Sequence, residues 1–251
     1  MRKHSLNQTQ ERRPGNNMLE DAYVIRMKDD VSSERLANNL IMSSIKSDND
    51  FNITKFDAIT PNRVASLMAL HNVKWNYPWE GSVTDFSSGL LKTAYPTRDR
   101  NKRIACFLSH FLLWKQCAKS EYGMFIFEHD AIFTKQVDVQ ALRDASYDII
   151  SLNDPRGATR KSGVFHEKVQ SHSSSVAPIP QIDDVSVPQG LPGNSAYFIK
   201  PEGAKKLLKL VSEFGAWPND AIMCRQLMPR QLGSVKDYCT TVQKSISTTT
   251  Q

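Results

Sequence analysis

The chain alternates between short apolar runs of strand character and segments in which apolar residues recur at helical spacing. From residue 22 onward a strand pattern is repeatedly followed by a helical one, which is the order typical of β-α units. The run 124–127 is apolar and aromatic throughout and therefore predicts a buried strand. Together these patterns predict an α/β fold. We expect strands over 22–27, 53–59, 124–127, 147–152 and 193–199, and helices over 33–44, 61–71, 106–117, 139–145 and 202–213.

Three stretches fall outside this pattern and set the predicted domain limits. Residues 1–20 are polar and predict a mobile arm, and residues 248–251 end a Ser/Thr-rich tail that is expected to fray. Residues 21–247 then form one domain. Within it, 155–192 is rich in Gly, Ser, Pro and charge, so we expect a long loop that is either a lid or disordered.

Two acids end the central apolar run, with Glu128 and Asp130 on either side of His129. Because strand side chains alternate, both carboxylates point to one face and the imidazole points to the other. Ligands of open α/β sheets bind at the carboxyl ends of strands, and paired carboxylates suit a hard cation such as Mn²⁺ or Mg²⁺. The alternative for so short a pattern is a pair of solvated acids.

Two further motifs accompany these acids. Cys106-x-x-Ser-His lies upstream, and Gly193-x-x-Ala-Tyr lies downstream and leads into Gly203-Ala-x-x-Leu-Leu. In this order the motifs resemble glycosyltransferase family 25, the group that includes lipooligosaccharide sugar transferases and collagen galactosyltransferases. The resemblance runs from about residue 22 to about residue 246 and is greatest to phage-encoded members. One departure is His129, which stands where the family motif Glu-Asp-Asp has its middle acid.

The resemblance implies a GT-A-like single domain with a mixed, mostly parallel sheet flanked by helices. It implies transfer from a nucleotide-diphosphate sugar, with UDP-sugars favoured, by direct displacement with inversion. Mn²⁺ or Mg²⁺ is expected at Asp130 and Glu128, and Asp220 is the candidate base for the acceptor hydroxyl, with Asp154 as a second candidate. The expected donor contacts are Asp57, Ser109, His110, Glu128 and Asn194.

Several of these residues also have a purely structural interpretation. Ser109 and His110 interrupt an apolar helix, where a single His is commonly a hydrogen-bonded structural residue. Asp57 suits a turn equally well, and Asp220 follows a Pro turn at a helix start, where an N-cap role accounts for it. No nucleophile-elbow glycines accompany a Ser-His-Asp order, so the sequence predicts no acyl-transfer triad.

The excess of 32 basic over 26 acidic residues, a net charge of +6, is concentrated at residues 1–13 and 98–103. Such runs form either a solvated face or a surface for phosphates. An aromatic block around Trp75 and Trp79 predicts a packed loop that either lines a sugar site or fills a gap in the core. The candidate phosphate- and acceptor-binding side chains are Arg98, Arg100, Lys102, Arg103, Trp75 and Trp79.

Four cysteines without paired spacing, Cys106, Cys117, Cys224 and Cys239, are expected to be buried reduced thiols. There is no apolar run near the length of a membrane span and no signal-peptide pattern. We therefore expect a cytoplasmic chain without a membrane span, in the host cytoplasm if it is phage-encoded.

Three functions remain open from the sequence. The phage-like motifs and the basic runs favour hydroxymethylated cytosine in double-stranded phage DNA as the acceptor. The first alternative is a transferase acting on lipopolysaccharide or another surface saccharide. The second is a non-catalytic sugar-nucleotide-binding or DNA-binding protein on the same fold. Retention of Glu128 and Asp130 favours an enzyme.

Overall fold

The structure is a computed structural model that describes residues 20–159 and 161–243. The predicted arm apart from Glu20, the basic run at 1–13 and the predicted tail at 248–251 lie outside the described residues. The strands are β1 Asp21–Arg26, β2 Ile53–Asp57, β3 Ser82–Asp85, β4 Leu90–Thr93, β5 Met124–Glu128, β6 Ala131–Phe133, β7 Ile149–Ser151, β8 Val176–Pro178, β9 Ala196–Ile199, β10 Leu232–Val235 and β11 Thr240–Val242. The helices are α1 Val31–Lys46, the 3₁₀ turn η1 Pro61–Arg63, α2 Val64–Leu70, α3 Arg100–Cys117, α4 Val139–Asp144, α5 Ser162–Gln170, α6 Pro201–Phe214 and α7 Asn219–Ile222.

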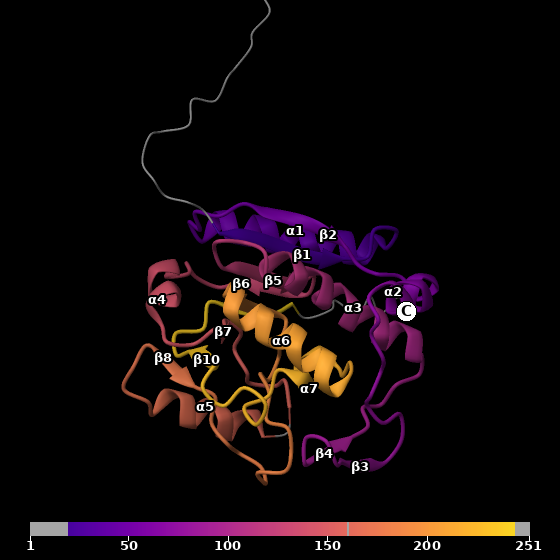
Figure 1. The fold of residues 1–251 in the computed structure, drawn as a ribbon. Helices are drawn as coiled ribbons and strands as arrows, with labels where there is room; N and C mark the ends of the chain where they lie inside the picture. Colours follow the sequence, from indigo (N-terminus) through magenta and orange to yellow (C-terminus); the bar gives the residue numbers. More distant parts are fainter. Residues whose placement is uncertain (1–19, 160, 244–251) are drawn as a thin grey trace, which may run out of the picture.

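A seven-stranded sheet in the order β2-β1-β5-β9-β7-β10-β8 forms the centre of the fold. Strands β8 and β9 run against their neighbours, whereas β1, β2, β5, β7 and β10 share one direction. The helices lie around this sheet, with α3 and α6 side by side (Figure 1). The predicted α/β class, with a mixed and mostly parallel sheet flanked by helices, is therefore confirmed.

The two faces of the sheet have different contents because side chains alternate along β5. On one face, the ring of Phe125 stacks on Phe51 at 4.4 Å between centroids, and Phe127 packs edge-on against Phe133. On the other face, Tyr197 of β9 contacts helix α3 through hydrogen bonds. The face that carries α3 is therefore the one toward which the even-numbered residues of β5, including Glu128, are directed.

Helix α3 begins six residues earlier than predicted. Asp99 caps it by accepting a hydrogen bond from the Lys102 N–H at 3.2 Å, so the basic run becomes the first turn of the helix. Further along, Leu108 and Trp114 are fully buried. The spacing of four residues places Lys102, Cys106 and His110 on one side of the helix, where all three line the same pocket.

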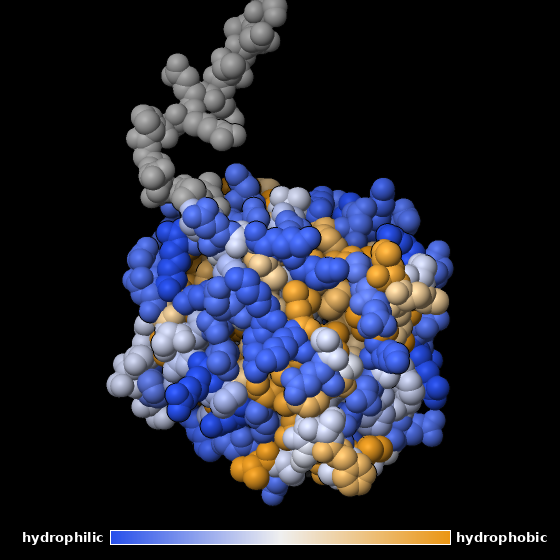
Figure 2. Space-filling view, in the orientation of Figure 1, coloured by the Kyte–Doolittle hydropathy of each residue, from blue (hydrophilic) through white to orange (hydrophobic). Residues whose placement is uncertain are grey.

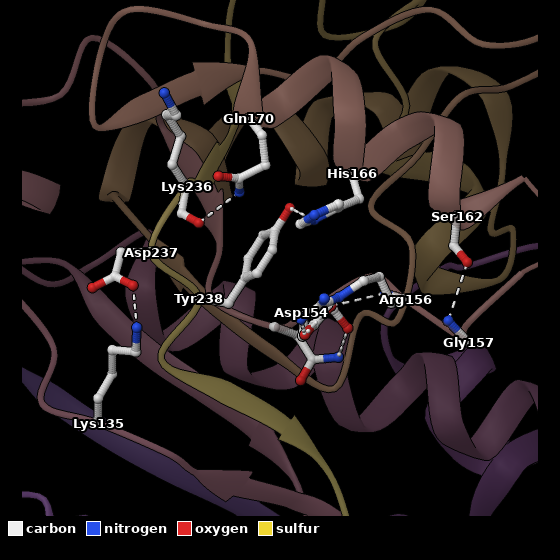
Figure 3. Close-up of polar contacts among 11 residues, drawn as sticks. Lys135, Asp154, Arg156, Gly157, Ser162, His166, Gln170, Lys236, Asp237 and Tyr238 are labelled. Carbon is white, nitrogen blue, oxygen red and sulfur yellow. Dashed lines mark hydrogen bonds and ion pairs between the residues drawn. The ribbon is translucent and has the colours of Figure 1, made fainter.

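The prediction of one unbroken loop over 155–192 is wrong, because this segment contains α5 and β8. Phe165 and Val169 are one helical turn apart and fully buried, which anchors α5 although the surrounding composition is polar. The Gln170 side chain also donates to the Lys236 carbonyl at 2.8 Å (Figure 3). A lid function for the segment remains a prediction.

The face seen in Figure 2 is largely hydrophilic, with hydrophobic residues visible in patches between hydrophilic ones. Phe86, at the tip of the β3-β4 hairpin, is 97% exposed. Within the described ranges, none of the helices has both the length and the apolar character needed to cross a bilayer.

Candidate active site

The carboxyl end of β5 and the beginning of β9 meet at one edge of the central sheet. The Glu128 N–H donates to the Ser195 carbonyl at 2.8 Å, which places Asn194 and Ser195 beside the acids that end β5. His129 turns toward α1, where its Nδ1 lies 2.7 Å from the Ser33 hydroxyl. The separation of His129 from the two acids therefore follows the alternation expected along the strand.

A chain of buried hydrogen bonds orients Glu128. The indole N–H of Trp114 donates to the Tyr197 hydroxyl oxygen at 2.8 Å, and that hydroxyl lies 2.9 Å from His110 Nδ1. The hydroxyl proton has an acceptor only if His110 Nδ1 is unprotonated, which leaves the imidazole proton on Nε2. His110 Nε2 then donates to Glu128 Oε1 at 3.2 Å. The buried His110 thus holds the partly exposed carboxylate at the sheet edge.

Replacing Tyr197 with phenylalanine tests this chain. The variant leaves the buried Trp114 N–H without its acceptor and releases His110, so the free energy of unfolding is expected to fall by about 2 kcal/mol. Chemical denaturation of wild type and variant measures the loss. Tyr23→Phe is the matched control, because the Tyr23 hydroxyl accepts its bond from Gln116 at the exposed end of α3. Equal stability of the wild type and the Tyr197 variant would contradict the proposed chain.

A pocket of about 380 Å³, which we call the α3 pocket, opens beside these residues. Its walls include Ile25, Ile59, Lys102, Cys106, His110 and Glu128. Ser109 also reaches it, yet its hydroxyl is occupied by the Ile59 N–H and the Ala105 carbonyl, both at 2.9 Å. Asp57 does not line the pocket, and its partly exposed carboxylate pairs with Arg26 of β1 at 2.9 Å.

A second pocket of about 290 Å³, the Asp220 pocket, is formed by Asp220, Tyr95 and residues of the 155–192 segment. Burial raises the pKa of the Asp220 carboxyl, and the nearby Glu128 raises it further, while Arg103 and a hydrogen bond with Tyr95 oppose the shift. Asp220 lies inside α7, where Pro218 precedes the helix and no side chain caps it. The N-cap interpretation of Asp220 is therefore wrong.

Gly190 packs against the backbone of Asp220 so closely that an added Cβ would meet its carbonyl oxygen at 2.2 Å. Residues of the 155–192 segment therefore pack beside Asp220 and form most of the lining of its pocket. A third, shallower pocket, lined by Arg98, Lys102 and Arg103, shares Lys102 and Cys106 with the α3 pocket.

Asp154 occupies a different position from Asp220, because it follows β7 whereas Asp220 lies inside α7. Arg156 donates to both of its carboxylate oxygens, from Nε to Oδ1 at 3.0 Å and from Nη2 to Oδ2 at 2.6 Å (Figure 3). This pairing holds the pKa of Asp154 below its ordinary value. A carboxylate whose two oxygens are engaged by a guanidinium is a poor base, so the geometry favours Asp220 over Asp154.

The aromatic block and Arg100 form a stack outside these pockets. The indoles of Trp75 and Trp79 lie 5.0 Å apart and nearly parallel, and the Arg100 guanidinium lies over the Trp79 ring at 5.3 Å. Trp75 also packs edge-on against Phe107 of α3. These contacts match the packing interpretation of the block, and neither indole lines one of the three pockets described above. Sugar stacking at Trp75 and Trp79 remains a prediction.

Comparison with known families identifies the class of protein. The family described as glycosyltransferase family 25 (LPS biosynthesis protein) matches residues 20–223, which contain both pockets and the acids between them. The chain belongs to glycosyltransferase family 25.

The resemblance of the motifs to this family is thereby confirmed, and the protein is a glycosyltransferase. Among solved structures, mouse xyloside xylosyltransferase 1 in its apo form is similar at 10% identity, with a TM-score of 0.44, over 85% of this chain and 83% of that chain. No curated protein matches the sequence.

Orphaned polar atoms test whether this glycosyltransferase suits a divalent cation. Among the described residues, seven buried side-chain polar atoms lack a hydrogen-bond partner, and four of them belong to Asp130, Asn194 and Ser195. Burial raises the pKa of Asp130, and the nearby Glu128 adds to the shift. Unpaired oxygens beside two repelling carboxylates are the donor set that Mn²⁺ or Mg²⁺ prefers, so the residues fit such an ion.

Sequence reasoning missed Cys106 as a site residue. The prediction that all four thiols are buried is wrong for Cys106, which is exposed on the wall of the α3 pocket, whereas Cys117, Cys224 and Cys239 are buried. The two cysteines of α3 differ because the beginning of the helix borders a pocket and its end lies under the sheet. The spacing of Lys102, Cys106 and His110 was the signal that could have revealed this side of the helix.

Proposed function

We propose that the chain transfers a sugar from a nucleotide-diphosphate donor in the α3 pocket to an acceptor hydroxyl that enters through the Asp220 pocket. One observation carries this proposal. Glu128 lines the first pocket and Asp220 the second, yet the Glu128 charge raises the pKa of Asp220. The two pockets also adjoin in space, because Cys106 in the lining of the first lies 4.0 Å from Asn219, the residue before Asp220. Adjoining pockets are what a donor site and an acceptor site require.

The α3 pocket suits the nucleoside part of the donor. Ile25, Ile59 and Pro61 provide apolar walls for a base, and Glu128 lies in the same lining. Glu128 and Asp130 are the proposed ligands of Mn²⁺ or Mg²⁺, which would act as a Lewis acid on the leaving diphosphate. Asn194, with both amide atoms unpaired, is the proposed polar contact to the donor on the β9 side. UDP-sugars are the first donors to test.

Asp220 is the proposed general base. The acceptor O–H proton passes to its carboxylate while the acceptor oxygen forms a bond to the anomeric carbon. On the opposite side of that carbon the bond to the diphosphate oxygen breaks, so the configuration is inverted. Tyr95 lines the same pocket, and its interaction with the Asp220 carboxyl lowers the pKa of that group against the effect of burial. The 155–192 segment, which supplies most of the lining of the pocket, is the proposed lid that limits access of water.

The proposed acceptor is hydroxymethylated cytosine in phage DNA. The basic side chains of Arg98, Lys102 and Arg103 line a shallow pocket that adjoins the donor site, and Arg100 lies on the same first turn of α3. A phosphate backbone that follows this surface would present a nearby hydroxymethyl group to Asp220. The family description as LPS biosynthesis proteins favours a surface saccharide as the second candidate.

Mass spectrometry of nucleosides tests the reaction and the acceptor together. Hydroxymethylcytosine DNA is incubated with the protein, Mn²⁺ and a panel of nucleotide-sugars. The expected result is a mass gain of one sugar on the modified base. Donor hydrolysis without that gain would reject DNA and direct the search to saccharides, and absence of both would overturn the proposed activity.

Salt dependence of DNA binding separates electrostatic contacts from other effects. Binding to duplex DNA is expected to weaken steeply with salt, and Arg98→Gln is expected to lower the slope of log K against log[salt] by about 1. Fluorescence anisotropy over a salt series measures both quantities. Lys209→Gln, on the exposed side of α6, is the control and is expected to keep the slope. A salt-independent or absent interaction would speak against DNA as the acceptor.

A further inference from the structure

Cys106, His110 and Glu128 form a compact group of three different ligand types at the α3 pocket. One ligand atom from each residue lies within 4.8 Å of the other two. Two of the three come from one side of α3, four residues apart, and the third comes from the end of β5. The group therefore joins a helix and a strand whose relative position is fixed by the core.

The chemistry of this group differs from that of the acids that end β5. A thiolate, an imidazole and a carboxylate are the ligands of zinc and related borderline cations, whereas Mn²⁺ and Mg²⁺ favour oxygen ligands alone. We propose that Cys106, His110 and Glu128 bind Zn²⁺, with a fourth position open to the α3 pocket. Tetrahedral ligands of Zn²⁺ lie about 3 to 4 Å apart, so only small side-chain rotations are needed from the observed arrangement.

In the surroundings of His110, the ring nitrogen that points away from the group already has an oxygen partner. A zinc-bound His usually donates its other ring N–H to an oxygen, which fixes the orientation of the ring. Here His110 Nδ1 faces the Tyr197 hydroxyl oxygen at 2.9 Å, inside the core. Cys106 is exposed to the pocket, and its only described partner, Asn219 Oδ1, is 4.0 Å away. The imidazole is therefore held in place, and the thiol is free to turn toward the cation.

The protons balance on binding. Cys106 releases its S–H proton to solvent as the Zn–S bond forms. His110 loses the proton from Nε2, gains one at Nδ1 and remains neutral. Tyr197 Oη then accepts from both His110 and Trp114, and the Tyr197 O–H proton gives up the hydrogen bond that it makes to His110 Nδ1 in the metal-free protein. Glu128 exchanges its hydrogen bond from His110 for a bond to the cation. One proton per Zn²⁺ is released, and the tautomer of His110 is reversed.

Zinc at this site would inhibit the transferase, a consequence that rests on the proposed function. Glu128 cannot serve Zn²⁺ and the proposed Mn²⁺ or Mg²⁺ site in the same geometry. The cation would also occupy part of the α3 pocket, where the donor is proposed to bind. Zn²⁺ binding itself does not depend on the catalytic assignment and is measured without substrate.

Cobalt(II) is the probe for the site, because a cobalt–thiolate bond gives a charge-transfer band in the near ultraviolet. Wild-type protein is expected to bind one Co²⁺ with this band and tetrahedral visible bands, and Zn²⁺ should displace it. Cys106→Ser is expected to abolish the band and to weaken Zn²⁺ binding about a hundredfold or more in competition with a chromogenic chelator. Cys117→Ser, which alters a buried thiol on the same helix, should keep both signals.

A further variant separates this site from the proposed catalytic one. Asp130→Asn is expected to keep the cobalt–thiolate band while it lowers Mn²⁺-dependent donor turnover. Circular dichroism confirms that the variants are folded. Absence of the band in wild-type protein, its persistence in Cys106→Ser, or its loss in Asp130→Asn would each overturn the zinc site. If the band behaves as expected but wild-type protein shows no transfer or donor hydrolysis, the proposed function fails and the zinc site stands.

Discussion

Replacing Asp130 with asparagine is expected to lower metal-dependent turnover of the sugar donor by about a thousandfold. The change keeps the size of the side chain and removes the charge that the proposed cation needs. A metal ion that stabilises the leaving diphosphate contributes several kcal/mol, and each 1.4 kcal/mol corresponds to about tenfold in rate. Within the part of the chain that the structure describes, Oδ1 of Asp130 is buried without a hydrogen-bond partner, so the substitution breaks no hydrogen bond at that oxygen.

Donor hydrolysis over a Mn²⁺ series measures the effect of Asp130→Asn without knowledge of the acceptor. The matched control is Asp138→Asn, because asparagine can still accept the capping bond that Asp138 accepts from the Ala141 N–H. Folding of both variants is compared by thermal denaturation. Loss of charge at Asp130 also removes the repulsion with Glu128, so the variant should be at least as stable as wild type. Full turnover in the Asp130 variant would refute the metal assignment.

The order of strands and helices followed from local patterns in the sequence. β1, β5 and α6 each bury a continuous apolar stripe or run, so their period is visible without knowledge of their neighbours. Helix α5 was missed because its stability depends on two buried side chains, Phe165 and Val169, within a polar segment. The hydrophobic pattern within a segment does not predict which strands are neighbours in the sheet. The strand order depends on contacts between strands that are distant in the sequence.

The candidate site was predictable only where it depends on local sequence patterns. The common direction of Glu128 and Asp130 follows from strand alternation, which is a local rule. The difference between Asp220 and Asp154 was not visible, because the partners of Asp220, Tyr95 and Glu128, lie about a hundred residues away in the sequence. Asp154 and Arg156 are close enough in the sequence for an ion pair between them to be predicted. Its geometry, however, depends on the turn that begins at Pro155.

Replacing Asp220 with asparagine is expected to lower sugar transfer by about 10³-fold while donor hydrolysis is retained. General base catalysis contributes about 10²- to 10⁴-fold, and an amide cannot accept the acceptor proton. Hydrolysis depends mainly on the cation and the acids at the end of β5, which the change leaves in place. Transfer and hydrolysis are measured in the same reaction, so each variant carries its own control. Asp154→Asn should keep most of the transfer activity, since Arg156 already engages both of its oxygens.

The pH dependence of transfer adds a test that depends on charge alone. The Asp220 carboxyl must be ionised to act as base, and burial and Glu128 raise its pKa above the ordinary value. Transfer should therefore fall as the pH decreases through a value above about 3.9, the pKa of an exposed aspartate. A bound cation would offset the effect of the Glu128 charge on this pKa but not the effect of burial. The fall in transfer activity at low pH, which we call the acidic limb, should therefore remain in saturating Mn²⁺. If the acidic limb lies at the pKa of an exposed aspartate, or if the Asp220→Asn variant shows the same limb as wild type, Asp220 is excluded as the base. Asp154 would then be considered again.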